Sequence, residues 1–240
     1  MSRILIEVCT GSLEDSITAS EAGADRIELN SSIELGGLST STGILLTVME
    51  HTRIPVITMV RPHPGGFVYT ENEKTAMLSD IDTFLSLGAA GIAVGALTAN
   101  GEVDTVFVSE VRKHVGECDF VFHRAFDLLP DLLKSASILK DLGVDRILTS
   151  GGSGTAWEGR DTLRDLINYF GDNLEILPGS GISSNNAAAL VEYTGCDQIH
   201  GSFSIKVTNP ESYAAVLPLQ GVKICSSEVR KTVLQQSRKI

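Results

Sequence analysis

The chain has 240 residues, 42% of them hydrophobic, so it can bury a large core as a single domain over residues 1–240. Its formal net charge of −11 would repel nucleic-acid phosphates and an anionic membrane surface, so we expect no binding to either. No run of ~18 apolar residues could span a bilayer, which favours a cytoplasmic protein. The four cysteines are scattered without a C-x-x-C pair, which argues against disulfides and a structural zinc site.

A Gly-x-x-x-Ile pattern occurs four times, beginning at Gly23, Gly88, Gly143 and Gly195. In each copy the glycine stands where a helix would end and the isoleucine begins an apolar strand, so each copy predicts a helix-to-strand turn. The interval from one copy to the next is 65, 55 and 52 residues, which leaves room for two βα units of about 30 residues each. Four such double units predict eight strands.

The remaining elements are predicted between these turns. Apolar β-rich runs indicate strands at 3–9, 55–60, 118–123 and 174–177. Helical patterns occur at 13–22, 41–50, 71–86, 103–114, 131–141, 162–169, 184–192 and 228–236. Capping residues support three of the helix starts: Ser12, Thr70 with Glu73, and Ser183.

Strict alternation of buried strands and helices predicts an α/β fold with a parallel sheet, and eight repeats close it into a (β/α)8 TIM-like barrel. The alternative is an open doubly wound sheet, which predicts a glycine-rich first turn. The first turn here, Cys9-Thr-Gly-Ser, holds one glycine. Residues 205–223 break the rhythm with two prolines, so we expect an irregular surface excursion there, before a C-terminal helix, as a region for oligomer contacts.

Polar residues at the C-terminal ends of the strands predict the site, because barrel active sites lie at that end. Charged and imidazole groups there suit acid–base chemistry, and we take five as catalytic candidates: Glu7, Glu28, His123, Asp127 and His200. An equally open alternative is a salt-bridge network that only orients the barrel strands.

Arginines and glycine-rich turns at the same end predict an anion-binding pocket. Backbone N–H groups in such turns and a following helix N-terminus attract anions, and phosphorylated metabolites are the ligand class that barrels commonly hold there. The candidates are Arg61, Arg124, Ser150, Gly151, Gly152, Gly179 and Gly181. The alternative is that these glycines only make tight turns.

A metal site would depend on sulfur ligands, and Cys9 and Met59 are the two that the strand pattern places at the mouth. A thiolate and a thioether select Cu(I) over Mg²⁺, and a histidine could complete the site. The other cysteines fall at strand starts or in the tail.

Several motifs together resemble the CutC copper-homeostasis protein family. They are Glu7-Val-Cys9, Gly23-Ala-Asp-Arg-Ile-Glu-Leu29, Gly36-Gly-Leu38, Ile54-Pro-Val56, Arg61-Pro62, Phe122-His-Arg-Ala-Phe-Asp127, Arg146-Ile-Leu-Thr-Ser-Gly-Gly152 and Pro178-Gly-Ser-Gly-Ile182. The resemblance implies a TIM-like barrel in the cytoplasm, a homo-oligomer (dimer or tetramer), and a role in copper tolerance with Cu(I) binding attributed to cysteines in some members.

The sequence departs from that family pattern at two positions. Asn30 stands in place of the cysteine of the usual Glu-Leu-Cys stretch, which removes the nearest sulfur partner of Cys9. Gln198 stands where an acidic residue often precedes His200. Two functions therefore follow as hypotheses. One is copper binding through Cys9 with Met59 or histidine, and the other is an enzyme or binder of a small anionic metabolite.

Overall fold

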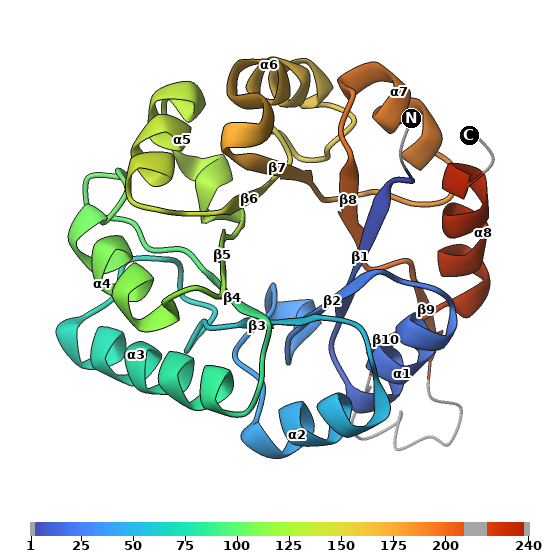
Figure 1. Cartoon of the computed structure of the whole chain (residues 1–240), viewed down its shortest axis with the longest axis horizontal. Coiled ribbons are helices and arrows are strands. Elements are labelled where there is room, and N and C mark those ends of the chain that lie inside the picture. The colour runs from blue at the N-terminus through green and yellow to red at the C-terminus, as the bar shows by residue number, and fades with distance from the viewer. Residues whose placement is uncertain (1–2, 209–219, 238–240) are drawn as a thin grey trace.

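The computed structural model describes residues 3–208 and 220–237. Eight parallel strands surround the centre of the molecule, and helices surround the strands (Figure 1). The strands are β1 (Leu5–Thr10), β2 (Arg26–Leu29), β3 (Val56–Met59), β4 (Gly91–Val94), β5 (Asp119–Phe122), β6 (Arg146–Thr149), β7 (Glu175–Pro178) and β8 (Gln198–Gly201).

The order of the strands follows the chain around the barrel. Each strand pairs in parallel with the next from β1 to β7, and β1 also pairs with β8. Within the described ranges only the β7–β8 edge has no hydrogen-bonded ladder. The pairing of the first strand with the last confirms the predicted barrel and excludes the doubly wound alternative, in which the strand order would reverse.

The helices match the predicted positions within a few residues. They are α1 (Leu13–Glu21), α2 (Thr42–His51), α3 (Glu71–Ser86), α4 (Thr105–Val115), α5 (Leu132–Asp141), α6 (Arg160–Phe170), α7 (Ala187–Thr194) and α8 (Ser226–Ser237), with short 3-10 turns η1 (Ile33–Leu35), η2 (Arg124–Leu128) and η3 (Gly171–Asn173). Ser12 caps α1, and Thr70 and Glu73 form the predicted capping box of α3.

Helix α7 begins three residues later than predicted. The backbone N–H of Ser183 donates to Asn186 Oδ1 (2.8 Å), which holds residues 183–186 in a turn before the helix. Asn186, not Ser183, is the residue that precedes the first helical residue. A side chain that bonds to nearby backbone competes with the helix in this way.

Alternation along the strands separates two apolar regions. Outward-facing residues such as Ile27 and Leu29 pack against the helices in the large core. Inside the barrel a smaller group, which we call the apolar barrel cluster, comes from β3 to β7: Ile57, Met59, Ala93, Val121, Leu148 and Leu177. Burial of each large apolar side chain contributes roughly 1.5–3 kcal/mol to folding.

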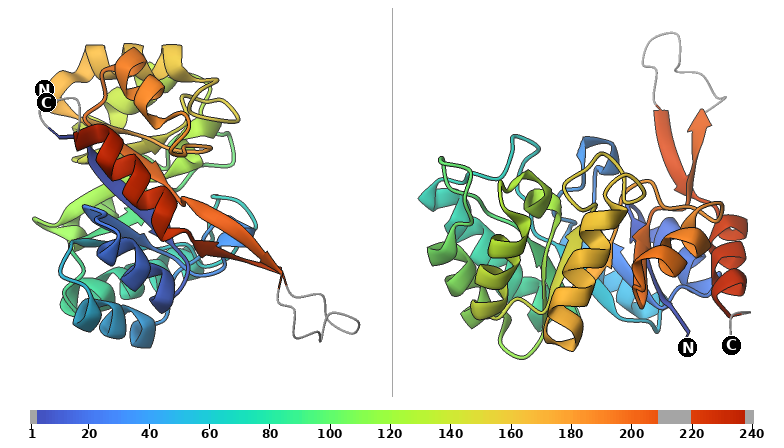
Figure 2. Two further views of the ribbon diagram at one scale, coloured as in Figure 1. Left: turned by 90° about the vertical axis from the view of Figure 1, so that its right-hand side faces the viewer. Right: turned by 90° about the horizontal axis from the view of Figure 1, so that it is seen from above.

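A two-stranded antiparallel ribbon projects from the barrel between β8 and the last helix (Figure 2). It consists of β9 (Ser204–Thr208) and β10 (Gln220–Ile224), so the two ends of the excursion expected at 205–223 are strands, while residues 209–219 lie outside the described residues. Helix α8 then packs against α1 and α7. Among the described residues no helix is long and apolar enough to cross a membrane.

Candidate functional site

A cavity of about 200 Å³ opens at the C-terminal ends of the strands. Residues from β1, β2, β3, β6 and β8 line it together with the loops that follow β2, β3 and β5. Seven of the residues predicted from sequence line this cavity: Cys9, Glu28, Met59, Arg61, His123, Arg124 and His200. Five strands and three loops thus bring these side chains together at one end of the barrel, as the barrel geometry predicts.

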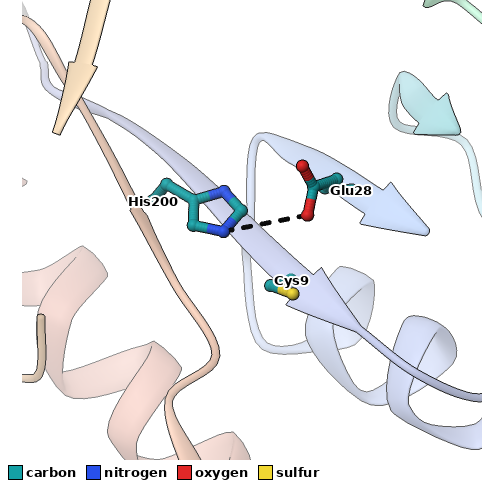
Figure 3. A group of neighbouring side chains, drawn as sticks. All are labelled: Cys9, Glu28 and His200. Carbon is teal, nitrogen blue, oxygen red and sulfur yellow. Dashed lines mark ion pairs between the residues drawn. The ribbon is translucent and has the colours of Figure 1, made fainter. Parts of the chain in front are cut away.

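Three potential metal ligands meet on one wall of the cavity, and we call them the Cys–Glu–His cluster. Cys9, Glu28 and His200 come from the neighbouring strands β1, β2 and β8 (Figure 3), and one ligand atom of each lies within 4.8 Å of the others. His200 Nε2 is 3.8 Å from Glu28 Oε2. The second oxygen of Glu28, Oε1, is buried and has no hydrogen-bond partner among the described residues.

Asn30 bridges two members of this cluster. Its Nδ2 donates to Glu28 Oε2 (2.9 Å) and lies 3.5 Å from Cys9 Sγ. The contact places position 30 beside the Cys9 sulfur, as expected from the missing Glu-Leu-Cys motif. Here an amide donor occupies the place that a second thiol would take.

Glu7 fixes the orientation of His200 from below the cavity. His200 Nδ1 is 2.7 Å from Glu7 Oε1, and the other oxygen of Glu7 accepts from Arg26 Nε. The imidazole therefore directs Nε2 toward Glu28. A carboxylate behind a histidine is the arrangement that fixes the tautomer of metal-binding or catalytic imidazoles.

The contacts continue through the barrel as an unbroken series, which we call the ionic chain. Arg26 donates to Gln198 Oε1 (2.9 Å), and Gln198 donates to Glu175 Oε2 (3.1 Å). Arg146 then joins Glu175 (2.5 Å) to Asp119 (3.2 Å) at the opposite end of the barrel. The ionic chain comprises Glu28, His200, Glu7, Arg26, Gln198, Glu175, Arg146 and Asp119.

The two carboxyl groups beside His200 have opposite pKa shifts. Burial alone would raise the pKa of Glu7, but Arg26 and His200 outweigh it and lower this pKa to about 2. Burial and the charge of Glu7 raise the pKa of Glu28. Burial lowers the pKa of His200, but Glu28 and Glu7 outweigh that effect and raise it. An ionised Glu7 thus faces a histidine that holds its proton more firmly.

Cys9 is a neutral thiol in this environment. Burial, and then the charge of Glu28, raise the pKa of Cys9 well above its ordinary value. Because a metal binds the thiolate, an incoming ion must displace the proton of Cys9.

Arg61 also lines the cavity and is held by backbone oxygens. Its NH1 donates to the carbonyls of Gly36 (3.2 Å) and Gly37 (3.3 Å), and its NH2 donates to that of Pro64 (3.2 Å). The guanidinium also stacks on the Phe67 ring, 4.8 Å from its centroid. Arg61 Nε remains without a hydrogen-bond partner in the described part of the chain.

His123 is buried next to Arg61. Its Nδ1 accepts the backbone N–H of Ala125 (3.1 Å), so the ring proton belongs on Nε2. Burial, with the charge of Arg61, lowers the pKa of His123 to about 3. The geometry favours a neutral hydrogen-bond donor at neutral pH, while the predicted role of His123 as a general acid or base stays a prediction.

The predicted anion-binding turn at 150–152 already holds an anion, and that anion is Asp127. The Asp127 carboxylate accepts the backbone N–H groups of Ser150 (3.0 Å) and Gly152 (3.1 Å) and the hydroxyl of Thr149 (2.5 Å). Arg124 pairs with the same carboxylate (2.8 Å). Asp127 and residues 150–152 do not line the cavity, so they support its wall through Arg124.

The turn at 179–181 also lies outside the cavity lining. A Cβ at Gly179 would lie 2.6 Å from Leu148 Cδ1 and 3.3 Å from the His200 ring, so only glycine leaves room for both side chains. Gly181 has a positive φ of 69°. Both glycines are accounted for by packing and turn geometry, and an anion at this turn stays a prediction.

Phe67 was not predicted from the sequence, although it contacts both Arg61 and His123. It belongs to the loop after β3, where no periodic pattern marks a functional position. The inner part of the ionic chain was also missed. The alternation of Arg146 and Glu175 with apolar strand residues is the signal that could have found it.

Three comparisons with known proteins agree with this geometry. The CutC family model matches residues 4–205. A relative from Treponema denticola, described as a family protein CutC, is 44% identical over 200 residues, which are 83% of this chain and 81% of the relative. A Streptococcus agalactiae crystal structure, described provisionally as a copper homeostasis protein CutC, is 32% identical with a TM-score of 0.78 and covers 83% of this chain and 98% of that chain.

A more distant structure shares the fold alone. Thiamine phosphate pyrophosphorylase from Pyrococcus furiosus has a TM-score of 0.62 at 14% identity, covering 98% of this chain and 96% of that one. Because a barrel hosts many unrelated activities, this likeness carries no functional argument. The family model and the relatives, in contrast, match most of the chain in sequence. The chain belongs to the CutC family.

Proposed function

We propose that the chain is a cytoplasmic copper-binding protein of copper homeostasis, with copper as its cargo at the Cys–Glu–His cluster. One observation carries this proposal: a sulfur, a nitrogen and an oxygen ligand atom lie within 4.8 Å of one another on the cavity wall. The name of the Streptococcus agalactiae relative supports copper as the cargo.

The donor set fits copper. Thiolate and imidazole are both copper ligands, and a carboxylate suits the divalent ion. Glu28 Oε1 is buried and has no hydrogen-bond partner among the described residues, so this carboxylate keeps an unused lone pair. Glu7 would keep the Nε2 atom of His200 free for the ion by binding Nδ1. Met59 lines the same cavity and offers a further soft ligand.

A competition titration tests this proposal. Cu(I) is added anaerobically to the protein and a chromophoric chelator, and Kd is compared between the wild type and Cys9→Ser. We expect Cys9→Ser to weaken binding at least tenfold, about 1.4 kcal/mol, because it removes the softest ligand. Cys225→Ser is the matched control, since that thiol lies outside the cavity. Equal affinities for wild type and Cys9→Ser would reject the site.

A second substitution tests the same site in the opposite direction. Asn30→Cys places a thiol where the amide now lies 3.5 Å from the Cys9 sulfur. Two adjacent thiolates suit Cu(I) better than one, so we expect affinity to rise above that of the wild type. An unchanged affinity would mean that Cys9 does not hold the ion.

A second candidate function is an enzyme or binder for a small anionic metabolite. Arg61 favours it, because this buried cation lines the cavity, binds backbone carbonyls and interacts with the Tyr69 hydroxyl, with no carboxylate paired to it among the described residues. Glu7, Glu28, His123, Asp127 and His200 stay the acid–base candidates. Proton transfer would be detected by NMR as deuterium uptake from D₂O into small carboxylic and phosphorylated metabolites, and uptake equal to that with Glu28→Gln would reject catalysis.

We also infer a homo-oligomer, a dimer or a tetramer, on the strength of the family resemblance. Sedimentation equilibrium at micromolar concentration tests this inference. A single species with the mass of one chain would reject it.

A further inference from the structure

A second part of the cavity wall, from the loops after β3 and β5, is built around one aromatic ring. Phe67 stacks under the Arg61 guanidinium at 4.8 Å and packs against the His123 ring at a centroid distance of 5.0 Å. Arg61 and His123 are 7% and 3% exposed, and all three residues line the cavity. Two polar side chains are therefore buried against one ring in the cavity wall.

Arg61 brings a positive charge that no carboxylate of the described residues pairs with. Its terminal nitrogens bind carbonyl oxygens of residues 35–37 and of Pro64, and Nε is left without a partner in the described chain. A buried charge without a counter-ion is costly, so such a group is retained where a ligand supplies the opposite charge. The Gly36 and Gly37 carbonyls hold the guanidinium plane in place.

His123 brings a neutral donor. With Nδ1 accepting from Ala125, the proton lies on Nε2, which also has no partner among the described residues. Gly95 after β4 makes room for this ring, because a Cβ there would collide with the imidazole. An unpartnered N–H donor buried beside an unneutralised cation is a combination that an anionic oxygen satisfies.

We propose that Arg61 Nε and His123 Nε2–H form an oxyanion subsite that receives the carboxylate or phosphoryl group of a small organic acid. The inference rests on the second candidate function and names its ligand atoms. Leu148 and Met59 line the same cavity, so the body of the ligand is short and partly apolar. Its far end faces the Cys–Glu–His cluster.

Arg124 is excluded from this subsite although it lines the same cavity. Its Nε pairs with Asp127 (2.8 Å) and its NH2 donates to Ser150 Oγ (3.1 Å). Its charge is therefore already neutralised within the chain. Arg61 and Arg124, both predicted to bind an anion, therefore differ in whether a carboxylate of the chain pairs with them.

Calorimetric titration of the full chain, treated with a chelator to remove metals, tests the subsite. The probes are sulfate, inorganic phosphate and acetate, so that phosphoryl-like and carboxylate groups are compared. We expect Arg61→Gln to raise Kd at least tenfold for the preferred probe and His123→Phe to raise it several-fold. Arg53→Gln, at an exposed arginine, is the matched control for net charge, and we expect Kd to stay within twofold. Equal losses in all three variants would overturn the proposal.

A measurement on the wild type keeps the test decisive if Arg61→Gln does not fold. In ¹⁵N-labelled protein the His123 Nε2–H resonance should shift on addition of the preferred probe, and the resonances of the exposed His51 should not. No shift of His123 at saturating probe would overturn the proposal.

The outcomes also separate this subsite from the proposed functions. Anion binding without copper binding would reject the copper site alone. Copper binding with no anion binding would reject the subsite, and the deuterium-uptake measurement would still decide on the second function. Anion binding without any deuterium uptake would reject catalysis and leave the subsite in place.

Discussion

The two halves of the barrel interior are filled by different kinds of side chain, apolar in one and charged in the other. Inward-facing positions of β3 to β7 nearer the mouth form the apolar barrel cluster, and Asp119, Arg146 and Glu175 lie at the other end of these strands. The inward-facing positions of β8, β1 and β2 carry the rest of the ionic chain. The apolar half needs only matched shapes, so it tolerates small changes. The ionic half needs every partner, because a buried charge without its counterpart is destabilising.

The cavity lies where these two halves meet. Met59 and Leu148 line it from the apolar half, and Glu28 and His200 from the ionic half. Buried ion pairs often add little net stability, so the ionic chain alone does not show that this half is the more stable one. We expect the ionic chain to serve the site by orienting His200. The free energy of unfolding should then be more sensitive to substitutions in the ionic half, as the following variants test.

The largest effect is expected for Arg26→Met. This change leaves Glu7 buried and ionised without its main partner, so we expect a loss of about 3–5 kcal/mol in the free energy of unfolding. Urea denaturation at pH 7 measures the loss. Arg3→Met is the control, since Arg3 pairs with Asp25 at the surface and exposed pairs contribute up to about 1 kcal/mol. Similar losses in both variants would remove the distinction between buried and exposed pairs.

The second-largest effect is expected from acid, which should lower the free energy of unfolding through the ionic half. The pKa of Glu7 falls from 4.5 to about 2 in the folded protein, so ionised Glu7 contributes about 3 kcal/mol that is present above pH 4.5 and lost as pH falls toward 2. The raised pKa of Glu28 has the opposite sign and offsets part of this loss. His200, also raised, keeps its contribution in acid and loses it as pH rises through its folded pKa.

The comparison of wild type with Glu7→Gln isolates the Glu7 contribution. Urea midpoints at pH 6, 5, 4 and 3 should converge for the two proteins as the pH falls. Parallel curves over this whole range would show that Glu7 does not titrate with folding.

The smallest effect is expected for Ile57→Val in the apolar barrel cluster. Removal of one methyl group from this buried residue should cost about 0.5–1.5 kcal/mol. No charge is involved, so the loss should be the same at pH 7 and pH 4. A loss that changes with pH would show that the two halves are coupled.

Much of this architecture was predictable because local patterns determine it. The Gly-x-x-x-Ile copies mark turns that require a positive φ, which glycine adopts readily. The four glycines of these copies all have positive φ: Gly23, Gly88, Gly143 and Gly195. Strand alternation then put Cys9, Glu28 and His200 on inward faces, and parallel pairing brought their ends together.

The rest depends on contacts between residues distant in the chain. Whether Asp127 or an outside anion binds the turn at 150–152 is decided by a side chain more than 20 residues away. The partners of Arg61 are four loop carbonyls and an aromatic ring, which no spacing rule identifies. Sequence patterns placed the charged residues at the mouth but did not reveal which charges were already neutralised.

Asp127 can also be regarded as a ligand that the chain carries with it. It is tethered beside the N–H groups of Ser150 and Gly152. A ligand on a short tether has an effective concentration of about millimolar or higher, which a free anion must exceed to replace it. The tethered carboxylate therefore occupies the turn and competes with free anions. Engineering a phosphate-ester site into this barrel would begin by replacing Asp127 with a shorter side chain.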